Sequence, residues 1–127
     1  MSFTKSLIGK KLLVVEDDEM LREMLVELFT DLKGEVLHAA NGTDAFKIVQ
    51  ENNIDVVLTD VRMPGGDGIE LAKNIHLMPG KKPVVFICSG FHDMSDEMIV
   101  EYNIAKVFSK PFDRKELTKA VIESVSK

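Results

Sequence analysis

The sequence predicts an α/β protein built on a doubly wound parallel sheet with helices on both faces. Five short apolar segments alternate along the chain with five segments whose apolar residues recur at helical spacing. This alternation is typical of βαβ units, in which each helix returns the chain to a parallel neighbouring strand. The apolar segments are also rich in β-branched residues, as expected of strands that are buried on both faces.

The five predicted strands are bounded by polar or turn-forming residues. They span residues 11–15, 35–40, 54–59, 84–88 and 105–108. After the third strand, the sequence Met63-Pro64-Gly65-Gly66 cannot continue a strand or a helix, so it predicts a loop. The glycine pair indicates loop flexibility there, since no GxGxxG or Walker pattern surrounds it.

The clearest predicted helix follows the first strand, with Asp18 as its expected N-cap. Its apolar residues recur at helical spacing, and Arg22 and Glu23 belong to the opposite, polar face. These apolar residues are Met20, Leu21, Met24, Leu25, Leu28, Phe29 and Leu32. Further helices are expected after residues 41–43, over 69–75, over 94–102 and after Asp113 as N-cap.

Size and composition predict one globular domain. The chain has 127 residues, of which 45% are hydrophobic and 29% charged, and this composition supports a buried core. We expect a single domain over residues 1–127, with its core at about 10–126 and no output domain. No apolar run approaches the length of a membrane span or a signal peptide, which argues against membrane insertion.

Charge and cysteine content narrow the expected setting. The formal net charge of −5 disfavours nucleic acid as a direct partner, because the phosphate backbone selects basic surfaces. Cys88 is the single cysteine, so the chain cannot form an internal disulfide. These features favour a reducing, cytoplasmic setting.

Polar residues stand where four of the predicted strands end. Right-handed crossovers place these ends along one edge of the sheet, where open α/β sheets bind ligands. The residues are Glu16 and Asp17 after the first strand, Asp60 after the third, Ser89 after the fourth and Lys110 after the fifth. Asp60 alone is equally consistent with a turn-capping role, but its convergence with the other four favours a functional site.

The residue types at this edge suit phosphoryl chemistry with a divalent cation. Three converging carboxylates repel one another unless a cation is present, and their oxygens are the ligands that Mg²⁺ prefers. An Asp beside Mg²⁺ can attack phosphorus and form an aspartyl phosphate. Mg²⁺ and Lys110 would stabilise the oxygens of the transferred group, while the Ser89 hydroxyl would hydrogen-bond to it. Asp60 is the candidate nucleophile.

Four motifs support this interpretation by their order and spacing. They are Leu12-Leu13-Val14-Val15-Glu16-Asp17-Asp18-Glu19, Thr59-Asp60-Val61-Arg62-Met63-Pro64 with Asp67-Gly68, Ser89-Gly90, and Lys110-Pro111-Phe112. Over roughly residues 10–126, the chain resembles the response-regulator receiver domains of two-component signalling, the chemotaxis regulators among them. The resemblance implies a flavodoxin-like (βα)5 fold with strand order 2-1-3-4-5.

The resemblance also implies a role for each candidate residue. Asp60 would accept the phosphoryl group from a sensor histidine kinase or a phosphotransfer protein, Ser89 would occupy the Ser/Thr switch position, and Lys110 would contact the phosphoryl group. Asp17, Asp60 and the backbone carbonyl of Arg62 would bind Mg²⁺ directly, while Glu16 would act largely through metal-bound water. Such a domain catalyses only its own phosphorylation and dephosphorylation.

The expected output is a change of surface. The receiver resemblance implies that phosphorylation changes the face formed by the fourth helix, the fifth strand and the fifth helix. A downstream effector protein, or a second copy of the chain after phosphorylation, would dock there.

Two alternatives are weighed against the receiver interpretation. A haloacid-dehalogenase-like phosphatase also uses an Asp nucleophile with Mg²⁺, but Asp60-Val61-Arg62 lacks the second acid of a DxD pair and the chain leaves no room for a cap. A receiver-fold binding module that works without phosphorylation would be expected to lack one of the site residues, and all are present in the sequence.

The chain departs from the family pattern in two places. The segment between Ser89 and Lys110 is about one residue short of the common family spacing, which predicts an abbreviated or irregular fourth helix. Val107 stands where the family often has a switch aromatic residue. Phe108 or Tyr102 is a hypothetical replacement, although aromatic residues more often serve packing.

Overall fold

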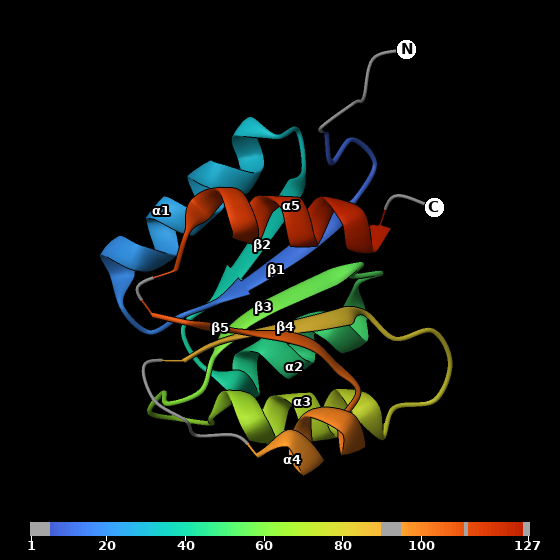
Figure 1. Ribbon diagram of the computed structural model, residues 1–127. Coiled ribbons are helices and arrows are strands. Elements are labelled where there is room, and N and C mark those ends of the chain that lie inside the picture. Colours follow the sequence, from blue (N-terminus) through green and yellow to red (C-terminus); the bar gives the residue numbers. More distant parts are fainter. Residues whose placement is uncertain (1–5, 90–94, 111, 126–127) are drawn as a thin grey trace.

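The fold is an alternating series of strands and helices, seen in a computed structural model that describes residues 6–89, 95–110 and 112–125. The strands are β1 (Lys11–Val15), β2 (Glu35–Ala39), β3 (Val56–Asp60), β4 (Val84–Ser89) and β5 (Ile104–Ser109). The helices are α1 (Glu19–Asp31), α2 (Gly42–Glu51), α3 (Gly68–His76), α4 (Asp96–Glu101) and α5 (Arg114–Val125). Figure 1 shows the strands forming one twisted central layer between two layers of helices.

The sheet has the predicted topology. Its order is β2-β1-β3-β4-β5, and every neighbouring pair is parallel. The register sets Val15 beside Thr59, Asp60 beside Cys88, and Ser89 beside Ser109. The carboxyl ends of β1, β3, β4 and β5 therefore lie level with one another along one edge.

Two apolar cores cover the two faces of the sheet. In β1, Leu13 and Val15 pack with buried residues of α2 and α3, whereas Leu12 and Val14 pack with buried residues of α1 and α5. This division follows from the two-residue period of a strand, which points successive side chains to opposite faces. Figure 1 shows the same division, with α1 and α5 on one side of the sheet and α2, α3 and α4 on the other.

The third strand begins later than the sequence predicted. We expected residues 54–59, and β3 runs from Val56 to Asp60. The reason is Asp55, whose backbone N–H donates to the carbonyl of Lys11 (2.8 Å) and whose carboxylate accepts from the Lys11 N–H (2.8 Å). Asp55 thus ties the start of β3 to the start of β1, and Asp60 becomes the last residue of the strand itself.

The fourth helix is short, in agreement with the expectation of an abbreviated or irregular helix. It spans six residues, Asp96–Glu101, within the expected 94–102, of which residue 94 lies outside the described residues. The Ser95 hydroxyl caps its start by accepting from the N–H of Met98 (3.2 Å). Its end is set by Asn103, whose positive φ of 55° turns the chain directly into β5.

Candidate functional site

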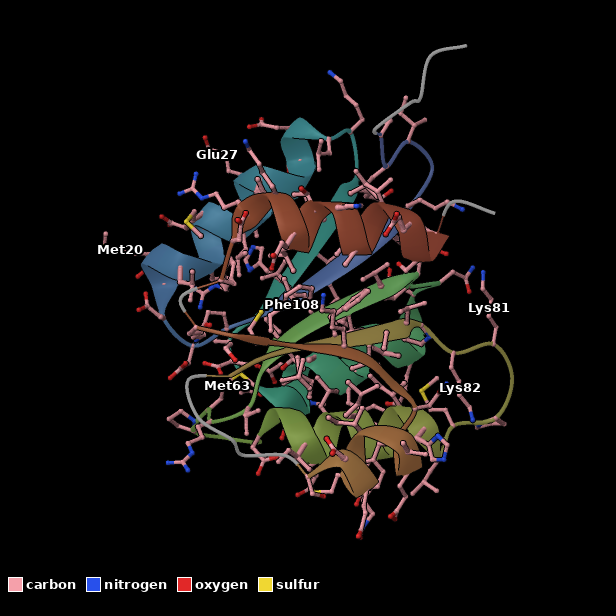
Figure 2. All side chains as sticks on the ribbon, viewed as in Figure 1. Met20, Glu27, Met63, Lys81, Lys82 and Phe108 are labelled. Carbon is pink, nitrogen blue, oxygen red and sulfur yellow. The ribbon has the colours of Figure 1, made fainter. Side chains whose placement is uncertain are left out.

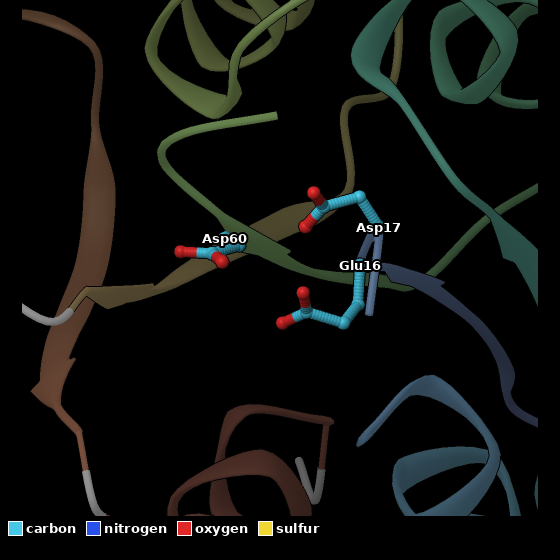
Figure 3. A group of neighbouring side chains, drawn as sticks. All are labelled: Glu16, Asp17 and Asp60. Carbon is cyan, nitrogen blue, oxygen red and sulfur yellow. The ribbon is translucent and has the colours of Figure 1, made fainter. Parts of the chain in front are cut away.

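The three predicted carboxylates come together at the carboxyl edge of the sheet. Glu16 and Asp17 directly follow β1, and Asp60 ends β3, the strand beside it. Oxygen atoms of all three side chains lie within 4.8 Å of one another. Figure 3 shows the three carboxylate groups on the same side of these neighbouring strand ends. The predicted convergence of these side chains is therefore present in the fold.

Glu16 is held on several sides. Its side chain is only 3% exposed. Its backbone N–H donates to the carbonyl of Ala39 (3.0 Å), and its Oε2 accepts from the N–H of Asp18 (3.1 Å). Burial raises the pKa of Glu16, and the neighbouring Asp17 carboxyl and the charge of Asp60 raise it further against the opposing effects of the Asp18 N–H and Lys110. Ionised Glu16 therefore needs a cation nearby.

Lys110 supplies one such cation. It follows β5, and its Nζ lies 2.8 Å from Oδ2 of Asp60 and 3.2 Å from Oε1 of Glu16. Partial burial alone would lower the pKa of Lys110, but the hydrogen bond to Asp60 and the charges of Glu16 and Asp60 together raise it. The ammonium thus links the ends of three strands through two charge-assisted hydrogen bonds.

Both carboxylate oxygens of Asp60 are oriented. Oδ2 accepts from Lys110, and Oδ1 accepts from the backbone N–H of Val61 (2.7 Å). The Asp60 side chain retains 14% exposure, so it can still be reached from outside. A fixed but accessible carboxylate is the arrangement that a nucleophile requires.

Gly68 packs directly on the backbone of Asp60. A Cβ on Gly68 would overlap the carbonyl oxygen of Asp60, which only a glycine avoids. The N–H of Gly68 also donates to the carbonyl of Val61 (2.7 Å). These contacts close the loop between β3 and α3 tightly under Asp60, and Asp67 caps α3 beside it by accepting from the N–H of Glu70 (2.8 Å).

The glycine pair in this loop is a packing contact. The Thr43 hydroxyl donates to the carbonyl of Gly65 (2.7 Å), and the N–H of Gly42 donates to the carbonyl of Gly66 (2.8 Å). A Cβ on Gly66 would lie 2.9 Å from the Thr43 nitrogen, and the φ of Gly66 is 128°. The interpretation of Gly65-Gly66 as loop flexibility alone is therefore wrong, because the pair lets the start of α2 brace the loop.

Two other predicted residues are placed only in part. Ser89 is the last residue of β4, which brings its backbone to the same edge, but its side chain lies outside the described ones. Arg62 is an exposed residue of the loop after β3, two positions beyond Asp60. The roles of the Ser89 hydroxyl and of the Arg62 carbonyl stay predictions.

The aromatic residues near Val107 serve packing. Phe108 is 4% exposed and packs with Phe86, their ring centroids 6.0 Å apart, in the core beneath α1 and α5. Figure 2 shows Phe108 between the sheet and α5. Val107 and Tyr102 pack against the core on the other face. Phe108 therefore points away from the side of the sheet that Val107 occupies, which agrees with the packing interpretation.

Sequence reasoning missed Arg22. The helical pattern puts Arg22 on the polar face of α1, yet its Nη1 donates to the backbone carbonyl of Glu16 at 2.8 Å. A signal was available, because long helical side chains point back toward the helix N-terminus. Arg22 follows the N-cap Asp18 by one helical turn, so its reach covers the loop that carries the two acids.

The donor set fits a hard divalent cation. Three carboxylates, if ionised, and the Lys110 ammonium together carry a net charge of −2, which one divalent ion neutralises. The ligand atoms are all oxygens, and they belong to side chains that range from buried to exposed. Mg²⁺ favours oxygen ligands and keeps several waters, which a partly open cluster permits.

Among the described helices, none combines the length and the apolar character that crossing a bilayer would demand.

Comparison with known proteins gives one consistent result. The model of the response regulator receiver domain family matches residues 12–122. The chain is 34% identical over 116 residues to sporulation initiation phosphotransferase F of Bacillus subtilis, covering 91% of this chain and 93% of that protein. It is also 34% identical over 113 residues to the response regulator receiver protein CpdR of Brucella abortus, covering 88% of this chain and 93% of that one.

A solved structure agrees with these sequence matches. The CheY-like response regulator receiver domain from Methylobacillus flagellatus superposes with a TM-score of 0.80 at 25% identity, over 91% of this chain and 98% of that one. Its fold is the flavodoxin-like arrangement that the strand order indicated. The chain belongs to the response regulator receiver domain family, the CheY-like signalling domains of two-component systems.

Proposed function

We propose that this chain acts as a response regulator receiver, which accepts a phosphoryl group on Asp60 in a Mg²⁺-dependent reaction. The donor is a phosphohistidine of a sensor histidine kinase or of a phosphotransfer protein. The single observation that carries the proposal is the position of Lys110, whose ammonium lies 2.8 Å from Asp60 and 3.2 Å from Glu16 within the acidic cluster. Receiver domains are phosphoacceptor signalling domains, not classical enzymes, and the chain's chemistry is limited to its own phosphorylation and dephosphorylation.

The transfer is a nucleophilic displacement at phosphorus. A carboxylate oxygen of Asp60 forms the new O–P bond, and the P–N bond to the donor histidine breaks. The electron pair of that bond goes to the imidazole nitrogen. The imidazole leaves in neutral form if its other nitrogen carries a proton, and otherwise takes up a proton from solvent. The product is an acyl phosphate, and the donor histidine is restored.

The protein's part in this step is alignment and charge neutralisation. Val61 N–H and Lys110 fix the Asp60 carboxylate before the donor arrives. The Lys110 ammonium lies close enough to Asp60 to pair with the oxygens of the arriving phosphoryl group as a mobile point charge. The Ser89 hydroxyl, at the end of the adjacent strand β4, is the proposed second hydrogen-bond partner of the phosphoryl group.

Mg²⁺ would be held by the carboxylates of Asp17 and Asp60 and the carbonyl of Arg62, with Glu16 acting through metal-bound water. When bound, it neutralises the phosphoryl oxygens as charge develops on them. The support for this assignment is the all-oxygen donor set within 4.8 Å and its excess negative charge.

The phosphorylated state is proposed to act through α4, β5 and α5. Lys110 directly follows β5, so a movement of its side chain toward the phosphoryl group would also shift the end of that strand. An effector protein, or a second copy of the chain, would bind the changed face. A further part of the proposal is that the chain acts in the cytoplasm, where Cys88 stays a free thiol.

The proposal is tested by incubating the protein with acetyl phosphate and Mg²⁺ and measuring the intact mass. We expect the mass of one added phosphoryl group, absent with EDTA and absent in the Asp60→Asn variant. The Asp31→Asn variant is the matched control, because Asp31 is an exposed residue at the end of α1. Phosphorylation of Asp60→Asn to the wild-type extent would refute the proposal. Multiple turnovers of small phosphate esters would instead favour the haloacid-dehalogenase-like alternative.

A further inference from the structure

We propose that Arg22 is a positioning residue for the acidic cluster. Its guanidinium fixes the carbonyl of Glu16, and through it the peptide that joins Glu16 to Asp17. This inference rests on the proposed metal-dependent function of the site, and it concerns how two of the three carboxylates are held ready for the cation. Arg22 itself contacts a backbone carbonyl of the site, at 2.8 Å from Nη1 to oxygen.

The Glu16 carbonyl lies where regular secondary structure stops. β1 ends at Val15, and the N–H of Glu16 still pairs with the carbonyl of Ala39 on the neighbouring strand β2. Asp18 then caps α1, so the chain reverses direction within the few residues between them. A carbonyl at such a turn needs a donor from elsewhere, and the half-buried Arg22 side chain provides it.

The position of the Glu16 carbonyl affects how both Glu16 and Asp17 are oriented. Because the peptide unit is planar, fixing the Glu16 carbonyl fixes the plane that joins the two α-carbons. Glu16 has further side-chain contacts with Asp18 and Lys110. Asp17 is exposed, so the direction of its carboxylate depends more heavily on this backbone plane. Loss of Arg22 should therefore displace Asp17 more than Glu16.

Arg22 contributes through its charge as well. A guanidinium is a positively charged group that donates in a fixed, planar geometry. A charged donor makes a stronger hydrogen bond to a carbonyl than a neutral one does. Arg22 also brings a permanent positive charge to a loop that carries acidic residues at positions 16–19, which lowers their mutual repulsion before a cation binds.

The expected consequence is a change in cation affinity without loss of the chemistry. Removing groups that orient metal ligands typically weakens metal binding by about 10- to 100-fold. With one hydrogen bond at stake, we expect the lower end of that range, about 10-fold. At saturating cation the ligands are drawn into place, so the maximal rate of Asp60 phosphorylation by acetyl phosphate should fall by less than about 2-fold.

The experiment measures Mn²⁺ binding directly by electron paramagnetic resonance, without any phosphoryl donor. The variants are Arg22→Met and Arg22→Gln, which remove the charged donor and keep a side chain of similar length, and Arg22→Lys, which restores a charged donor. The matched control is Arg114→Gln, because Arg114 lies on α5 and contacts the sulfur of Met24. Either of the first two variants suffices if the other does not fold.

We expect about 10-fold weaker Mn²⁺ binding in Arg22→Met and Arg22→Gln, substantial recovery in Arg22→Lys, and no change in Arg114→Gln. The Mg²⁺ concentration for half-maximal phosphorylation should rise in parallel while the maximal rate holds. Wild-type affinity in the two uncharged variants would overturn the inference. Equal losses in Arg22→Lys would also overturn it, because a charged donor would then not be the cause. Failure of the wild-type protein to bind Mn²⁺ would instead refute the proposed function.

Discussion

The backbone of Gly68 lies against the carbonyl of Asp60 so closely that no side chain can stand between them. A Cβ at position 68 would overlap the Asp60 carbonyl oxygen and would lie 3.1 Å from the hydroxyl of Thr59. That hydroxyl itself donates to the Asp60 carbonyl (2.9 Å). Gly68, the first residue of α3, therefore fixes the position of the end of β3, which carries the proposed phosphoacceptor Asp60.

Gly68→Ala should lower both stability and phosphorylation. The added methyl must push the backbone of Asp60 or of α3 aside, and overpacking of this kind costs about 1–3 kcal/mol in the free energy of unfolding. Urea unfolding measures this cost, and acetyl phosphate labelling should be slower because Asp60 is displaced. Gly80→Ala is the control, since a Cβ there meets no atom within 4 Å and carries only the cost of its positive φ. Normal labelling of a folded Gly68→Ala variant would contradict this account.

Lys110→Met should destabilise the metal-free protein. The variant keeps the length of the side chain but leaves the carboxylates of Glu16 and Asp60 without their shared ammonium. Breaking a largely buried ion pair costs about 3–5 kcal/mol, and the 26% exposure of Lys110 reduces our expectation to about 1–3 kcal/mol. Urea unfolding in EDTA tests this, and Mg²⁺ should narrow the difference from the wild type.

Lys81→Met is the matched control for that experiment. Lys81 pairs with Asp55 at 3.6 Å, but its side chain is 83% exposed, and Figure 2 shows it far from the strand ends near Met63. Exposed pairs contribute little, so its loss should change stability by less than about 0.5 kcal/mol. Equal effects of the two substitutions would show that Lys110 makes no special contribution to the site.

Glu16→Gln should make stability less dependent on pH. Burial, with the Asp17 carboxyl and the charge of Asp60, raises the pKa of Glu16 in the folded protein against the opposing effects of the Asp18 N–H and Lys110. A raised folded-state pKa gives stability that is complete below the ordinary Glu pKa and is lost as the pH rises through the raised value. At neutral pH without metal, the Glu16→Gln variant should therefore unfold at higher urea than the wild type.

The difference in stability between the wild type and Glu16→Gln should disappear at low pH. At pH values below the ordinary Glu pKa the wild-type side chain is protonated, so the two proteins should unfold at similar urea concentrations. Glu23→Gln on the exposed side of α1 should show no such pattern. A wild-type protein that is more stable than Glu16→Gln at neutral pH in EDTA would mean that the Asp18 N–H and Lys110 together outweigh the burial of Glu16.

Thr43→Val tests the brace between α2 and the loop after β3. The change keeps the shape of the side chain and removes the hydroxyl that donates to Gly65 at 2.7 Å. We expect a loss of about 0.5–1.5 kcal/mol in the free energy of unfolding. Thr118→Val is the control, because the Thr118 hydroxyl donates within its own helix, to the carbonyls of Arg114 (2.9 Å) and Lys115 (3.2 Å). Its loss should cost less than about 0.5 kcal/mol. Equal losses would remove the brace as a stabilising feature.

Much of the fold was predictable because the signals are local and repeat. Apolar runs with turn residues between them gave every strand and helix, and capping preferences placed Asp18 and Asp113 correctly, as the hydrogen bonds to Leu21 and Lys115 show. The convergence of Glu16, Asp17 and Asp60 followed from parallel topology alone. Strand boundaries were less accurate where a side chain replaced ladder pairing, as at Asp55.

The supporting contacts of the site could not be read in the same way. Arg22 reaches a backbone carbonyl across a turn, and Gly66 packs on α2, which is distant from it in sequence. Both contacts depend on how closely the two segments approach in space, which the sequence does not show. A polar helix position and a glycine pair have many commoner uses. The candidate site residues could be recognised by their types and their order along the chain, whereas the residues that position them could not.

Chemical trapping can show whether Asp60 becomes an acyl phosphate. After incubation with Mg²⁺ and acetyl phosphate, borohydride reduction converts an aspartyl phosphate to homoserine, and tandem mass spectrometry locates the change in the sequence. We expect homoserine at position 60 alone, and only when Mg²⁺ is present. Unmodified aspartate at position 60, with the phosphoryl group on another residue or on none, would contradict it.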